Sequence, residues 1–237
     1  PEAIAVNIRR VWKISPVGLA GMFAVGGASM LLQSMAPIYT TSLGYGPADV
    51  GLVMFLMQVG LISIQMPMGA LSDRIDRRIV LAIVSAGSIL LAGLAFGTAG
   101  ATSLIMLIVI FAIWNGFNET VYSVSSALAN DRADPADYVM LSSTQMIAWS
   151  FAAFIIPSTA TLILAFVPIY YFIPMGGLIS ACFMLFVLFR MRVRDEVPQE
   201  EREDFQAVTA QVAYPGDYSN PDAYEDEDAG STEGLVS

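Results

Sequence analysis

The sequence predicts an all-α membrane protein, a six-helix bundle with both ends of the chain on the same side. Of its 237 residues, 56% are hydrophobic and only 14% are charged, which is more apolar than an ordinary soluble domain. Four stretches contain no charged residue and are 23 residues or longer: 14–48, 50–72, 79–118 and 138–189. A helix needs about 20 apolar residues to span a bilayer, so these stretches together hold six spans.

Basic residues lie only in every second connection between these spans. They precede the first span, follow the second and the fourth, and follow the last: Arg9, Arg10, Lys13, Arg74, Arg77, Arg78, Arg132, Arg190, Arg192, Arg194 and Arg202. The other connections, residues 39–49, 97–102 and about 166–170, contain no Lys or Arg. Because basic connections are retained in the cytoplasm during insertion, we expect both termini to be cytoplasmic.

The lengths of the uncharged stretches divide them into spans. The first stretch holds one span, 16–38, followed by a loop, and the second holds 50–71. The third stretch is 40 residues long and makes two spans, 79–97 and 103–129, the later one running past Glu119. The last is 52 residues long and makes 139–165 and 170–190. Residues 16–192 therefore form one bundle after a cytoplasmic lead-in of residues 1–15.

The net charge of −10 comes from the end of the chain. Residues 195–237 contain 13 of the 21 acidic residues and one of the 11 basic residues. They show no apolar periodicity, so we expect residues 193–237 to be a disordered acidic tail in the cytoplasm.

The composition argues against several classes of function. The chain has no histidine and one cysteine, Cys182, inside the last span. We therefore expect no disulfide, no metal site and no cofactor. No nucleophile–base pair or phosphate-binding loop is visible, which argues against an enzyme. The basic residues mark topology rather than a patch, so we expect the lipid bilayer and not nucleic acid as a partner.

The connection between the second and third spans carries the most specific motif. Residues 69–78 are Gly-Ala-Leu-Ser-Asp-Arg-Ile-Asp-Arg-Arg, followed by Ile-Val-Leu. This segment resembles motif A of the major facilitator superfamily (MFS), G-x-L-x-D-R-x-G-R-R/K-x-x-L, and stands at the same place in a six-helix unit. Asp76 occupies the position where the superfamily usually has glycine, and aspartate tolerates turn conformations.

Further segments resemble a narrower group, the YcaD-like bacterial permeases. They are residues 12–18 (Trp-Lys-Ile-Ser-Pro-Val-Gly), 129–132 (Ala-Asn-Asp-Arg) and 134–143, which end in Ser-Ser. The resemblance covers about residues 8–192 and implies the C-terminal half of a twelve-helix fold made of inverted repeats. It also implies a small-molecule substrate, a missing N-terminal six-helix half as partner, and the bacterial inner (plasma) membrane as location.

The motif has a physical interpretation beside the resemblance. Gly69 lets another backbone approach closely, and Asp73 can cap a neighbouring helix or face its positive end. The arginines can bind carboxylates or helix-end carbonyls. Such contacts form a gate if they exist in one state and break in the other. The candidate gate residues are Gly69, Leu71, Asp73, Arg74, Arg77 and Arg78. The alternative is that the arginines only set topology.

Glu119 is the only acidic or basic residue well inside a predicted span. A charge there costs roughly 2.5–3.5 kcal/mol on insertion scales, so it normally faces a cavity or a partner. Asn115, Glu119, Tyr122 and Ser126 share one helical face, and the first span offers Gln33. We expect Glu119, Asn115, Tyr122 and Gln33 to bind substrate or couple transport to protons. The alternative is that Glu119 only bonds Asn or Gln across the bundle.

Two functions remain open. The favoured one is a secondary active transporter, or permease, that moves a small solute by alternating access, driven by protons or by the solute's own gradient. The other is a non-transporting six-helix scaffold or sensor whose acidic tail recruits partners. Motif A favours the first and the tail favours the second. The sequence specifies neither the substrate nor the direction of transport.

Overall fold

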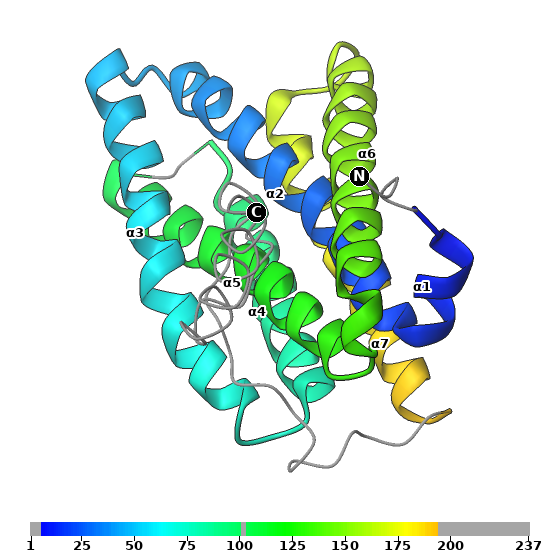
Figure 1. Ribbon diagram of the computed structural model, residues 1–237. Helices are drawn as coiled ribbons and strands as arrows, with labels where there is room; N and C mark the ends of the chain where they lie inside the picture. Colours follow the sequence, from blue (N-terminus) through cyan, green and yellow to red (C-terminus); the bar gives the residue numbers. More distant parts are fainter. Residues whose placement is uncertain (1–5, 101–102, 194–237) are drawn as a thin grey trace, which may run out of the picture.

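A computed structural model describes residues 6–100 and 103–193, and this part of the chain is all-helical (Figure 1). Among the described residues, six helices are long and apolar enough to cross a membrane. The elements are α1 (Ile8–Ile14), α2 (Pro16–Ser42), α3 (Pro47–Ser72), α4 (Arg77–Gly97), α5 (Leu104–Asn130), η1 (Pro135–Asp137), α6 (Tyr138–Leu164), η2 (Ile169–Tyr171) and α7 (Phe172–Met191).

The helices α2 to α7 correspond to the six predicted spans. The largest difference is at the end of α2, which continues through Pro37 to Ser42 instead of ending at residue 38. Proline removes one backbone donor, and membrane helices tolerate this. α3 begins earlier than predicted because Pro47 occupies its first turn, a position that suits proline.

A short helix, α1, lies within the expected lead-in. It begins after Asn7, whose side-chain oxygen accepts a hydrogen bond from the Arg10 N–H at 3.0 Å and so caps the helix. Ser15 then caps α2 by accepting a hydrogen bond from the Gly18 N–H at 3.3 Å. The two caps divide the segment into a short helix and a span at residue 15.

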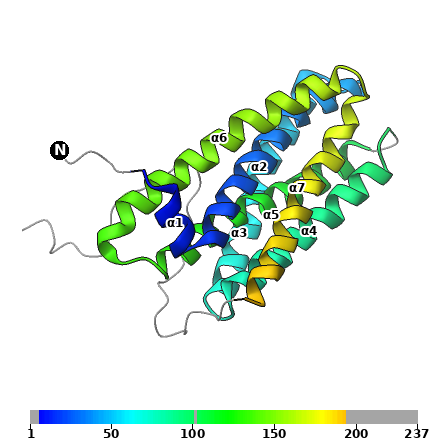
Figure 2. The same ribbon diagram turned by 90° about the vertical axis from the view of Figure 1, so that its right-hand side faces the viewer.

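The centre of the bundle is formed by α2 and α5. α2 contacts α5, α6 and α7, and α5 also contacts α3 and α4. α3 packs mainly on α5 and α6 packs mainly on α2, so α3 and α6 flank the central pair (Figures 1 and 2). α5 therefore has helices on several sides, and this decides where its polar side chains point.

Glycines allow α3 and α5 to approach each other closely. A Cβ atom added at Gly116 would lie 2.7 Å from the carbonyl oxygen of Gly60 and 2.7 Å from the Cβ of Ile64. Small residues have this role at many helix contacts in membranes. The contact leaves no room for a side chain at Gly116.

Replacing Gly116 by alanine should therefore destabilise the bundle, by about 1–3 kcal/mol if the added methyl group acts as overpacking. Gly93→Ala is the matched control, because a Cβ at Gly93 meets nothing within 4 Å. Thermal unfolding of both variants in detergent gives the comparison. A Gly116→Ala variant as stable as the wild type would contradict the packing assigned to this contact.

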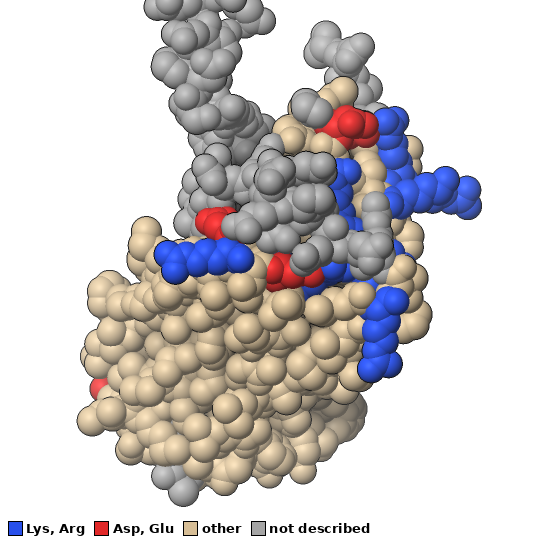
Figure 3. Space-filling model, turned by 90° about the horizontal axis from the view of Figure 1, so that it is seen from below, with Lys and Arg blue, Asp and Glu red and all other residues tan. Residues whose placement is uncertain are grey.

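Every Lys and Arg of the described residues lies at one end of the bundle, which we call the basic end. This end carries α1, the α3–α4 and α5–α6 connections and the end of α7. Figure 3, which views the molecule from below, shows Lys and Arg on this face. The predicted acidic tail lies outside the described residues apart from Val193, as do Arg194 and Arg202.

Candidate functional site

The motif residues 69–78 form the last turn of α3, a short connection and the start of α4. Gly69 is buried, and its carbonyl oxygen accepts hydrogen bonds from the Ser72 hydroxyl at 2.8 Å and from the Asp73 N–H at 3.2 Å. Leu71 packs against the apolar cluster at the basic end. Asp73 is the C-terminal cap of α3, and its side chain is 36% exposed.

Arg77 makes a buried ion pair that joins two helices. Its Nε lies 2.8 Å from Oδ2 of Asp131, which follows the last residue of α5, and both side chains are 1% exposed. Asp73 is more distant, with Oδ1 at 3.7 Å from a terminal nitrogen of Arg77. Removing one partner of a buried pair leaves an uncompensated charge. The pair therefore holds the start of α4 against the end of α5.

Asp76 replaces the usual glycine of the motif without straining the turn. Its φ is −55°, so this position does not need the left-handed conformation that favours glycine. The Asp76 carboxylate accepts a hydrogen bond from the Arg78 N–H at 2.9 Å and lies 2.7 Å from a terminal nitrogen of Arg78. In this chain the residue that departs from the motif caps α4.

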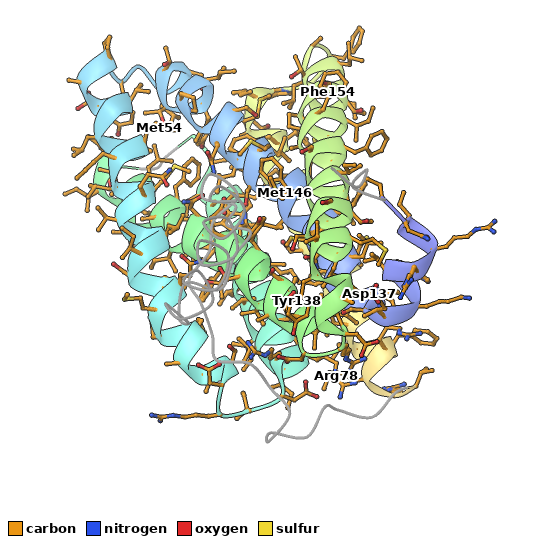
Figure 4. All side chains as sticks on the ribbon, in the orientation of Figure 1. Met54, Arg78, Asp137, Tyr138, Met146 and Phe154 are labelled. Carbon is orange, nitrogen blue, oxygen red and sulfur yellow. The ribbon has the colours of Figure 1, made fainter. Side chains whose placement is uncertain are left out.

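The three arginines of the motif occupy different environments. Arg74 is exposed, whereas Arg77 and Arg78 are buried. Figure 4 labels Arg78 at the basic end, where its guanidinium pairs with Asp76 of the same turn. Arg77 reaches a second helix, so its contacts change if α4 and α5 move relative to each other.

The intramembrane carboxyl group of Glu119 lies near the middle of α5 and is 4% exposed. Gln33 of α2 donates a hydrogen bond from Nε2 to Oε1 of Glu119 at 3.2 Å. One turn further along α5, the Tyr122 hydroxyl donates to the sulfur of Met146 at 3.4 Å. Met146 belongs to α6 and is labelled in Figure 4. The structure thus gathers Gln33, Glu119 and Tyr122 where α2, α5 and α6 meet.

Asn115, which was predicted to belong to the same site, points to α3 instead. Its Nδ2 donates a hydrogen bond to the carbonyl oxygen of Met57 at 3.0 Å. Asn118 points to α4, where its Oδ1 accepts a hydrogen bond from the Ser88 hydroxyl at 3.1 Å. The polar side chains of α5 therefore meet different neighbouring helices, because α5 contacts α2, α3, α4 and α6.

The sequence matches the Major Facilitator Superfamily over residues 17–220. The chain belongs to this superfamily. The match begins in α2 and continues past the last described residue, beyond the end near residue 192 that was expected for the resemblance. No curated protein and no solved structure matches the chain. Members of the superfamily are transporters and not enzymes, and the six candidate spans are those of an integral membrane protein.

Two contacts of this MFS protein involve residues that the sequence did not single out. Asp131 was not predicted as the partner of Arg77; the available signal was an acidic residue at the end of the fourth span, on the same predicted side as the motif. No pattern in the sequence indicated that Met146 contacts Tyr122. Among residues 6–100 and 103–193, no group of three or more His, Cys, Asp or Glu is placed to hold a metal ion.

Proposed function

We propose that this chain is one half of a secondary active transporter that moves a small solute by alternating access and couples the movement to protons. The observation that carries the proposal is the buried carboxyl group of Glu119 beside Gln33. An acidic residue inside a bilayer is costly and typically marks an ion or proton pathway. Gln33 and Tyr122 add uncharged hydrogen-bonding groups, which suit a small polar solute.

The turn formed by residues 69–78 is the proposed gate. Arg77 links α4 to α5 through Asp131, and Asp73 is exposed enough to contact a further helix end. Contacts of this kind drive a conformational change only if they differ between the two states of the transporter. The gate therefore acts by stabilising the state that is closed at the basic end.

We infer that the basic end faces the cytoplasm and that the protein resides in the inner (plasma) membrane of a bacterium. The first inference rests on the retention of basic connections during insertion. The second rests on residues 12–18 and 129–143, which resemble the YcaD-like permeases.

A second six-helix half is the proposed partner. Gln58 supports this proposal, because it is exposed near the middle of α3. An amide in contact with hydrocarbon is unfavourable unless another polar group meets it. A protein surface over α3 provides such a group, and in superfamily members the substrate site lies between two halves.

Reconstitution in proteoliposomes tests the proposed function. The chain alone should show no saturable uptake of dyes, sugars or amino acids under an imposed pH gradient, because one wall of the cavity is absent. Addition of the N-terminal six-helix half of a YcaD-like permease should give saturable, gradient-dependent uptake. Saturable uptake by the chain alone would contradict the half-transporter, and lack of uptake in every combination would contradict transport.

A further inference from the structure

The short helix α1 presents a surface that the transport mechanism does not use. Val11 is fully buried against α2, α5 and α6, and it fixes the inner face of α1. On the outer side, Ile8 is 59% exposed and Trp12 is 47% exposed. Arg9 and Lys13 are also exposed and lie one helical turn apart. The outer side of α1 thus combines apolar and cationic groups.

α1 meets the end of α7 through an aromatic contact. The rings of Trp12 and Phe186 lie 5.8 Å apart, centroid to centroid. Arg190 follows Phe186 by one helical turn on the same face of α7. Leu185 and Phe189 are more than 60% exposed on the outside of α7, so this stretch presents an apolar surface suited to lipid. Trp12 therefore lies at the depth where the apolar surface of α7 gives way to cations.

Two contacts hold α1 in this position. Arg10 pairs with Asp137, which directly precedes α6, with 2.8 Å between NH2 and Oδ2. The backbone N–H of Asn7 donates to the Thr144 hydroxyl in α6 at 3.2 Å. Figure 4 shows Asp137 next to α1, and Figure 1 shows α1 outside the bundle beside the ends of α6 and α7. These contacts hold the helix that carries Arg9 and Lys13 against α6.

We propose that Arg9, Lys13 and Arg190 bind the phosphate-bearing headgroup of an anionic phospholipid, whose acyl chains lie against Trp12 and Ile8. We call this set of residues the α1–α7 surface. Cations near the headgroups each contribute to binding of anionic lipid, and tryptophan favours the interface between headgroups and acyl chains. The surface provides both kinds of group on α1 and on the end of α7, which meet at Trp12 and Phe186.

The apolar residues favour a lipid over the other anions available to these cations. Free phosphate binds cations such as Arg9, Lys13 and Arg190 equally well. It has no apolar part to cover the exposed side chains of Ile8 and Trp12, whereas the acyl chains of a phospholipid cover them. A helix with cations beside exposed Trp and Ile is typical of elements that lie in the membrane interface.

The proposal predicts a preference for anionic lipid that depends on α1. Phosphatidylglycerol and phosphatidylcholine are titrated separately into the purified full chain in detergent, and bound lipid is measured by native mass spectrometry. The wild type should bind phosphatidylglycerol more tightly. Arg9→Gln/Lys13→Gln should weaken this binding by about fivefold for each cation removed, or roughly 25-fold for the pair. The affinity for phosphatidylcholine should not change.

Arg74→Gln is the matched control, because Arg74 is an exposed cation at the same end of the bundle but remote from α1 in the chain. It should leave phosphatidylglycerol binding unchanged. The proposal would be overturned if the control and the double variant lost equal affinity for phosphatidylglycerol, or if the double variant lost none. Soluble glycerol phosphate binding as tightly as the lipid would overturn it as well. So would the absence of a preference for phosphatidylglycerol, which is the result expected if residues 195–237 occupy the surface.

A second measurement does not depend on the folding of the charge variants. Phosphatidylglycerol with brominated acyl chains should quench the fluorescence of the wild type more strongly than that of Trp12→Phe. The other two tryptophans, Trp114, which is 1% exposed, and Trp149, which is half-buried in α6, are present in both proteins, so the difference in quenching reports on Trp12. Equal quenching in the two proteins would show that Trp12 does not contact the bound lipid.

Discussion

Replacing Glu119 by glutamine should abolish proton-driven solute accumulation by the complete transporter, while solute exchange continues. Glutamine keeps the shape of the side chain and can still bond Gln33, whose Nε2 lies 3.2 Å from the carboxyl oxygen. It cannot release or take up a proton. Uptake into proteoliposomes under a pH gradient should therefore fall to the level of empty liposomes, while counterflow of labelled solute without a gradient should remain.

Glu119→Asp is the matched control, because it retains a titratable carboxyl group at the same buried position. This variant should keep a gradient response, although its shorter side chain weakens the contact with Gln33. Melting temperatures in detergent show whether each variant is folded. A glutamine variant with the wild-type dependence of uptake on pH would make Glu119 a helix-bridging residue, which is the alternative that its hydrogen bond to Gln33 also allows.

The six spans could be predicted from the sequence because the bilayer imposes a length and a polarity on each of them. Uncharged stretches of sufficient length and the alternation of basic connections are local properties of the chain. The short helix α1 was not predicted, because a seven-residue helix containing three cations has neither the length nor the apolar composition of a span. Its existence depends on the Asn7 cap and on burial of Val11 in a tertiary contact.

The candidate site was predictable only in part, for a physical reason. Helical periodicity correctly places Asn115, Glu119 and Tyr122 along α5, but it does not say which helix lies opposite each side chain. In the bundle Asn115 meets the backbone of α3, and Glu119 meets Gln33 of α2. The partner of Arg77 could not be predicted for the same reason. Asp131 is distant from Arg77 in the sequence and becomes its neighbour only when α4 packs on α5.

Arg77→Ala should destabilise the folded protein by about 3–5 kcal/mol, because it removes the guanidinium that lies 2.8 Å from the buried carboxylate of Asp131. Asp73→Asn is the matched comparison. The side chain of Asp73 is 36% exposed and lies 3.7 Å from Arg77, so its contact with Arg77 should contribute less than about 1 kcal/mol to stability. Unfolding in detergent, followed by circular dichroism, measures the two effects. A similar loss of stability in both variants would contradict the expectation that the Arg77–Asp131 contact stabilises the fold more than the Arg77–Asp73 contact.

The double variant Arg77→Met/Asp131→Leu separates stability from gating. Replacement of a buried pair by apolar side chains is often neutral, so this variant should recover much of the stability lost in Arg77→Ala. If the pair only holds α4 against α5, transport by the complete protein should recover together with stability. If the pair and Asp73 belong to a gate, transport should remain impaired in the stable double variant and in Asp73→Asn. Initial rates of uptake at matched protein levels distinguish the two results, and normal rates in both variants would reduce the motif to a signal for topology.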